Sequence, residues 1–274
     1  MRRTILKIAI LMASWVMMAQ GVLANYPQEM SADTLKKVSA KDGIEVTRVR
    51  PYPYFEVRAG FGIGGTVPFP LPPQMRKIEG FKPLGNFSVQ TLANMPFNEH
   101  WEMLMGLRFE RKAMTADATV KDYNMSIQDD DGGTITGRWT GFVSMSADQI
   151  MLTMPLEATY NITSKGCIRA GLYFSYVTRG KFYGEVKNGY LREGNPTGAK
   201  IEIDEEPQTF EFNDDMRRFQ WGWTVGGEWR LYKAFSFFVD LDWGLNNVFV
   251  KDFETISFDM FPIFGTVGIG YSFK

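Results

Sequence analysis

Apolar and polar side chains alternate with a period of two from about residue 51 to the C-terminus, and this alternation constrains the fold more than any other feature of the chain. A period of two places alternate side chains on opposite faces of a β-strand. In residues 219–231, for example, large apolar side chains alternate with glycine and polar residues. Eight such segments predict an all-β protein, and they cover residues 54–65, 86–95, 101–110, 152–162, 168–176, 219–231, 235–245 and 263–273.

A soluble β-sandwich or a lipocalin-like barrel also alternates, so three further features decide between the architectures. Glycines and charges share one face while large aromatics share the other, as a small barrel in lipid requires. The aromatics fall near strand ends, where two interfacial belts are expected. Short connections alternate with long ones, which is typical of periplasmic turns and outer loops. We therefore predict an eight-stranded antiparallel up-and-down transmembrane β-barrel with long outer loops.

The first residues have the features of a secretory signal. Basic residues come first, an apolar run covers residues 8–18, and small residues precede the expected cleavage after Ala24. The run is shorter than the roughly 20 residues of a membrane-spanning helix. We predict a signal peptide at residues 1–24, a periplasmic tail or short plug at 25–50, a barrel domain at 51–274, and an outer-membrane location.

Composition excludes several classes of partner and site. Lys and Arg number 30 against 31 Asp and Glu, so the chain lacks the basic excess that nucleic-acid binding needs. One His and one Cys exclude a disulfide framework and the usual multi-His or Cys-rich metal sites. We expect no nucleic-acid partner, no cofactor and no metal.

Eight strands form the smallest closed barrel, whose interior is filled by side chains. Charges inside such a lumen must be paired, because an unpaired charge away from water is costly. We therefore predict an ionic network and no open pore. The network residues are Glu56, Arg58, Arg108, Glu110, Glu157, Arg169, Glu228, Arg230, Asp240 and Asp242.

The candidate catalytic residues do not assemble into a known constellation, so we expect no enzymatic activity. His100 is expected in a solvated periplasmic turn, and Cys167 is expected to be a small packing residue. Asp240 and Asp242 share a face, but a carboxylate–His site at the outer rim would need a histidine near that rim, and the sequence places none there. Residues 129–133 (DDDGG) offer oxygen ligands for Ca²⁺ but lack a distal bidentate Glu, which favours a solvated hairpin tip.

Besides the alternating strands, the chain has an Asp/Gly-rich second outer loop, the stretch at residues 189–198 (GYLREGNPTG) and the ending at 268–273 (GIGYSF). In these features it resembles the PorT-like outer-membrane β-barrel proteins. The resemblance implies that Tyr271 and Phe273 form the signal that the barrel-assembly machinery reads during biogenesis. Lys274 follows Phe273 here, whereas family members usually end at the Phe. One branch of the family is associated with protein secretion.

Three functions follow as hypotheses. The first is a structural or interaction protein whose outer loops bind a protein or glycan, with outer-membrane lipid around the barrel. The second is an accessory component of a secretion system, and the third is a barrel enzyme acting on lipid or peptide. Seven apolar or aromatic loop residues form either a partner surface or an extension of the barrel wall: Phe69, Leu71, Trp139, Phe142, Phe182, Tyr183 and Tyr190.

Overall fold

A computed structural model describes residues 53–98, 100–128, 134–203, 206–251, 253, 256 and 258–273. The predicted signal peptide, the periplasmic tail, the 129–133 segment and Lys274 lie outside the described residues. In the described part of the chain, no helix has the length and apolar character that crossing a membrane requires.

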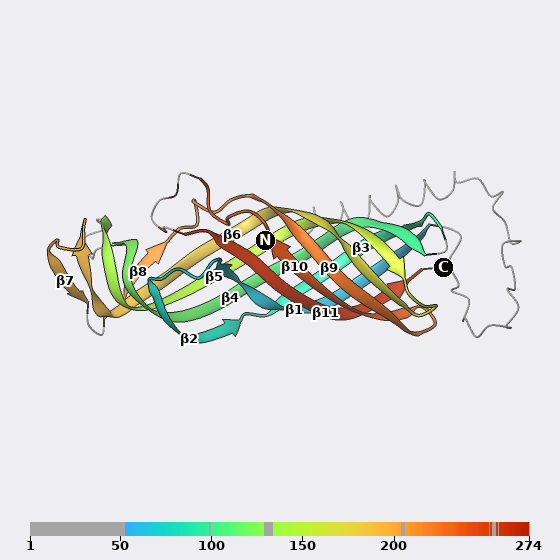
Figure 1. The fold of residues 1–274 in the computed structure, drawn as a ribbon, viewed down its shortest axis with the longest axis horizontal. Coiled ribbons are helices and arrows are strands. Elements are labelled where there is room, and N and C mark those ends of the chain that lie inside the picture. Colours follow the sequence, from blue (N-terminus) through green and yellow to red (C-terminus); the bar gives the residue numbers. More distant parts are fainter. Residues whose placement is uncertain are drawn as a thin grey trace, which may run out of the picture.

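Strands make up almost all of the described structure, and they run along an elongated barrel (Figure 1). The long connections contain the short strands β2, β7 and β8, and β7 lies at the end opposite the last residues of β11 (Figure 1). The described strands are β1 (Tyr54–Pro68), β2 (Met75–Pro83), β3 (Asn86–Pro96), β4 (Trp101–Gln128), β5 (Thr134–Asn161), β6 (Gly166–Glu193), β7 (Lys200–Ile203), β8 (Gln208–Glu211), β9 (Phe219–Tyr232), β10 (Phe235–Gly244) and β11 (Met260–Ser272).

Eight of the described strands close into an antiparallel ring, which confirms the predicted barrel. The order is β1-β3-β4-β5-β6-β9-β10-β11, and β11 pairs with β1 to complete it. Closure leaves no strand edge in the wall, as a sheet in lipid requires. Outside the ring, β2 pairs with β4, while β7 and β8 pair with β6.

In the half of the barrel near the short turns, which we call the lower part, alternate side chains point into the lumen and to the exterior. Along β10 every second residue is buried and the others are exposed. On the exterior, Phe61 is 75% exposed and Val225 is 55% exposed. Large apolar groups at such exposure would be costly in water but are stable against acyl chains. Exposed aromatics also stand near the two ends of this region, among them Trp101, Trp229 and Tyr271 at one end and Phe61, Tyr176 and Trp243 at the other.

Strands β4, β5 and β6 are each 28 residues long. About 10 tilted residues suffice to cross the membrane, so well over half of each strand projects beyond it. In this projecting part the outward-facing side chains become polar and the inward-facing ones become apolar. On β5, Leu152 and Met154 face outward in the lower part, whereas Ser144 and Ser146 face outward above it and Met145 is buried. The projecting wall is therefore built for water outside, as in a soluble sheet.

The long strands correct the predicted boundaries of two outer loops. Residues 111–128 and 134–151 are strand rather than loop, and β6 continues to Glu193 instead of ending at Tyr176. Trp139, Phe142 and Phe182 accordingly lie in strands of this wall, which we call the outer extension: β4 from Arg111, β5 up to Ile150, β6 from Val177, and the connections that pack on them.

Candidate functional site in the lumen and the outer extension

Two groups of ion pairs lie inside the barrel. In the group nearer the outer end, Arg108 on β4 donates to Asp242 on β10 with 2.7 Å between Nη2 and Oδ2. Lys112 Nζ lies 3.0 Å from Asp242 Oδ2 and 3.4 Å from Glu110 Oε1. Thr153 donates to Glu110 from β5. All five side chains are buried, so each charge meets an opposite charge where water is excluded.

The second group lies nearer the periplasmic turns and centres on two guanidinium groups. Arg58 contacts Glu56 on its own strand and Glu228 on β9. Arg169 on β6 also contacts Glu228, with 2.9 Å between Nη1 and Oε2. The two arginines therefore share one carboxylate. Arg169 reaches two further carboxylates, those of Glu157 on β5 and Asp240 on β10.

Inward-facing aromatic rings stand beside both groups. The guanidinium of Arg58 lies 5.4 Å from the ring centroid of Phe238, and Lys112 Nζ lies 5.1 Å from Tyr173 and 5.4 Å from Phe264. These three rings are almost fully buried. A glycine permits the close packing at Gly226, where a Cβ would come within 2.1 Å of Asp240 Oδ1. Charged and aromatic side chains together occupy the barrel interior at this level.

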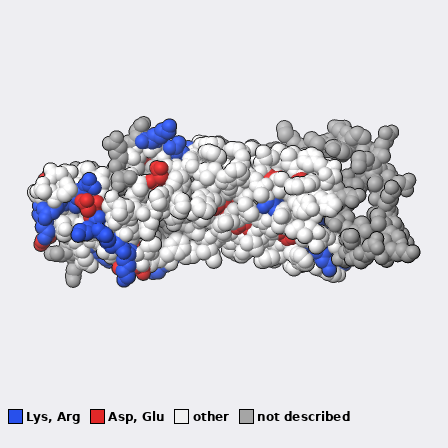
Figure 2. Space-filling view, viewed as in Figure 1, with Lys and Arg blue, Asp and Glu red and all other residues white. Residues whose placement is uncertain are grey.

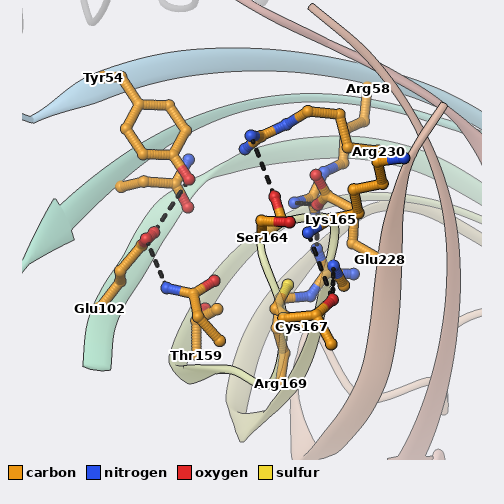
Figure 3. Close-up of a pocket in the computed structure, with 14 residues that line it drawn as sticks. Tyr54, Arg58, Glu102, Thr159, Ser164, Lys165, Cys167, Arg169, Glu228 and Arg230 are labelled. Carbon is orange, nitrogen blue, oxygen red and sulfur yellow. Dashed lines mark hydrogen bonds and ion pairs between the residues drawn. The ribbon is translucent and has the colours of Figure 1, made fainter. Parts of the chain in front are cut away.

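At the periplasmic mouth the lumen opens into a small polar pocket (Figure 3). Glu102 accepts hydrogen bonds from Tyr54 Oη at 2.9 Å and from Asn161 Nδ2 at 2.8 Å. Arg230 sits at the rim, where its guanidinium donates to the Ser164 carbonyl at 3.5 Å rather than to a carboxylate. Among the described residues Arg230 forms no ion pair, so the structure leaves it outside the network that the sequence predicts.

The interior of the outer extension is apolar. Its buried core includes Met114, Trp139, Phe182, Phe210 and Phe249, contributed by the long strands, β8 and the connection after β10. The Phe182 ring meets the Phe249 ring edge-on, with centroids 5.0 Å apart. Above the ionic groups, a packed hydrophobic core therefore fills the space that the strands enclose.

Charged side chains gather on the outside of the outer extension, whereas the middle of the molecule is mostly uncharged (Figure 2). Several cations lie over aromatic rings there. Lys200 Nζ is 4.8 Å from the Tyr190 ring, and Lys187 Nζ is 5.3 Å from the Phe142 ring. Tyr183 is exposed and Phe182, its neighbour, is buried, so the two residues serve opposite faces of β6.

The other candidate residues do not meet in one place. His100 is exposed and stacks on Tyr160, with ring centroids 5.8 Å apart. Cys167 faces inward at the periplasmic mouth, among the residues that line the pocket. Asp240 and Asp242 are engaged by different cations, Arg169 and Arg108. Among the described residues, no group of three or more His, Cys, Asp or Glu side chains is placed to hold a metal ion.

The residues of the proposed assembly signal lie at the end of β11. Tyr271 and Phe273 are both exposed, and their rings meet edge-on with centroids 5.1 Å apart. The backbone N–H of Phe273 donates to the carbonyl of Phe55 at 2.8 Å. Residues 271–273 thus lie along the closing strand pair of the ring.

Sequence reasoning missed Lys112, which belongs to the ionic network although it falls in a predicted loop. Its signal was present, because Lys112 continues the inward series of Arg108 and Glu110 at a spacing of two. Tyr54 and Asn161 were also missed as partners of Glu102. Both stand at strand ends, where alternation alone does not tell which side chains converge.

Comparison with known proteins identifies a family. Residues 52–250 match the family model described as outer membrane protein beta-barrel domain. No curated protein matches the chain. Similar solved structures include Ail, the attachment invasion locus protein of Yersinia pestis, crystallised with the heparin analogue sucrose octasulfate, at 10% identity and a TM-score of 0.35, covering 81% of this chain and 97% of that one. The outer membrane protein OprG from Pseudomonas aeruginosa is similar at 12% identity and a TM-score of 0.30, covering 84% of this chain and 98% of that one.

Proposed function

This chain belongs to the outer membrane protein beta-barrel domain family, and we propose that it is an integral outer-membrane protein with a sealed lumen that acts as a structural or interaction protein through its outer extension. The filling of the lumen carries the proposal. Ion pairs cross the barrel at one level, and an apolar core occupies the level above it. A solute path would have to break both, so the function is assigned to the outer surface.

The outer extension offers what a contact surface needs. Its wall is held rigid by three long, paired strands and by its own core. On its exterior, Tyr183 is exposed, Arg179 and Lys181 are exposed beside it, and Tyr190 lies under Arg192 and Lys200. Aromatic and cationic side chains on a rigid frame are the groups that dominate protein contacts and that stack on or hydrogen-bond to sugars. We propose a protein or glycan as the partner.

The test uses surface substitutions rather than deletion, because removing residues 180–215 would also remove Phe182 and Phe210 from the core. A variant with Lys181→Ser, Tyr183→Ser and Tyr190→Ser is compared with Lys165→Ser in a periplasmic turn. The purified proteins, in lipid nanodiscs, are applied to immobilised glycans and extracellular-matrix proteins. We expect binding by the wild type and by Lys165→Ser, and loss of binding by the triple variant. Equal binding by all three would overturn the assignment.

A role as an accessory component of a secretion system is the alternative, supported by the resemblance to the PorT-like proteins. With a sealed lumen, such a role would act through contact with another envelope protein and not through transport in this barrel. Gentle solubilisation of the envelope followed by co-purification separates the two proposals. A stoichiometric complex with secretion components supports the alternative, and a lone barrel supports the first proposal.

A further inference from the structure

Residues 69–83, in the connection between β1 and β3, carry an exposed apolar surface that lies outside the lumen and outside the buried core of the outer extension. Four apolar side chains are strongly exposed along it: Phe69 at 56%, Leu71 at 57%, Ile78 at 58% and Phe81 at 43%. Both faces of β2, which forms the second half of this connection, are mostly exposed. Apolar exposure on this scale within one short connection marks a surface that another phase or molecule covers.

The position of this connection identifies what covers it. The Phe69 ring meets the ring of Trp243 on β10 edge-on, with centroids 5.6 Å apart. Trp243 faces outward at the outer end of the membrane-facing wall, as do Phe61 and Ile63 on β1. The lipid-facing wall is therefore in contact with the start of the connection at Phe69. The wall beside this contact is the part that a transmembrane barrel presents to lipid.

The same connection carries a local excess of positive charge. Arg76, Lys77 and Lys82 lie on β2 with one acidic residue, Glu79. That carboxylate is engaged, because it accepts from Lys77 and from Thr119. Arg76 and Lys82 are exposed and form no ion pair with any residue that the structure describes. Two cations are thus available to a negatively charged partner.

We propose that residues 69–83 form a lipid-binding segment seated on the outer leaflet of the membrane. Phe69 and Leu71 enter the interfacial region, where amphipathic and aromatic segments are most stable. Arg76 and Lys82 meet the phosphate groups of anionic lipids, whose surface potential attracts basic segments. This segment is separate from the contact surface on β6 and β7, so the proposal stands independently of the partner proposed above.

A fluorescent probe at one position tests the depth of the segment. In a Cys167→Ser background, Leu71→Cys is labelled with an environment-sensitive dye and the protein is folded into phosphatidylcholine vesicles. Ala199→Cys, in the exposed turn before β7 at the outer tip, is the matched control. We expect the dye at position 71 to be quenched by a nitroxide attached near the lipid headgroup. We expect the dye at position 199 to be quenched by iodide in the aqueous phase. Iodide quenching at both positions, without lipid quenching at 71, would show that the segment faces water or a protein partner and would overturn the proposal.

A second pair of measurements tests the role of charge. The Leu71 probe is compared in vesicles of phosphatidylcholine alone and of phosphatidylcholine mixed with phosphatidylglycerol, with and without Arg76→Gln and Lys82→Gln. We expect the anionic lipid to shift the emission further to the blue, and the double substitution to abolish that additional shift while leaving the emission in phosphatidylcholine unchanged. An additional shift that survives the double substitution would contradict the assignment of phosphate binding to these two cations.

Discussion

Arg108 on β4 and Asp242 on β10 form an ion pair across the full width of the barrel, with 2.7 Å between Nη2 and Oδ2. Their strands stand four positions apart in the eight-stranded ring, which is the largest separation that the ring allows. A direct contact between opposite walls leaves no room for a water-filled channel at that level. The barrel is therefore packed through its centre like the core of a soluble protein, but with charges as the packing groups.

Removing one charge from this pair should be costly. Asp242→Asn leaves Arg108 and Lys112 with Glu110 as their remaining carboxylate, in a site away from water. Breaking a buried pair in this way typically costs about 3–5 kcal/mol. Urea unfolding of the protein in lipid vesicles, followed by tryptophan fluorescence, measures the change in the free energy of unfolding. Asp214→Asn, at an exposed position, is the control, and an equal effect of the two substitutions would contradict the structural role of the pair.

The membrane-facing exterior predicts a different sensitivity at Val225 on β9. Along β9, Val225 lies about midway between Trp221 and Trp223, near the outer end of the membrane-facing wall, and Trp229, near its periplasmic end. Val225→Arg should therefore place a cation near the bilayer centre and destabilise the folded barrel by about 2–4 kcal/mol. Tyr183→Arg, on the exterior of the outer extension, should have little effect because that surface faces water. Similar unfolding free energies for the two variants would mean that Val225 does not face lipid.

The apolar core of the outer extension should be a separate point of weakness. Phe182→Ala opens a cavity between the rings of Phe212 and Phe249, and such truncations cost about 3–5 kcal/mol. Limited proteolysis is expected to cut within residues 206–218 or 245–253 in this variant, while the membrane-embedded strands stay protected. The Tyr183→Ala variant, at the neighbouring exposed position, should be cleaved in the same way as the wild type. Unchanged proteolysis of Phe182→Ala would show that the core does not hold these connections in place.

Period-two alternation sufficed to predict the eight strands and which side chains face the lumen near the membrane. It failed above the membrane because the solvent changes. On β5 the outward-facing residues are Leu152 and Met154 in the lower part but Ser144 and Ser146 above it. A prediction that requires apolar side chains on the outside therefore ends the strand between these two pairs. The inversion itself is a readable signal, since it marks where lipid gives way to water.

Most of the ionic residues could be named from the sequence, but their partners could not. Which carboxylate Arg169 meets depends on strand stagger and on the size of the lumen, and Glu157, Glu228 and Asp240 all lie within its reach. Alternation also placed Arg230 with the inward charges, because it shares their face of β9. Its position at the strand end puts it at the rim instead, beside the Ser164 carbonyl.

Electrical recording in planar lipid bilayers tests the sealed lumen most directly. The purified, folded protein is inserted and the current is measured across a range of salt concentrations and voltages. Because opposite walls meet through Arg108 and Asp242 and an apolar core lies above them, the conductance should stay at that of the bare bilayer. Stable, stepwise openings that scale with the salt concentration would show a continuous aqueous path and would contradict the account.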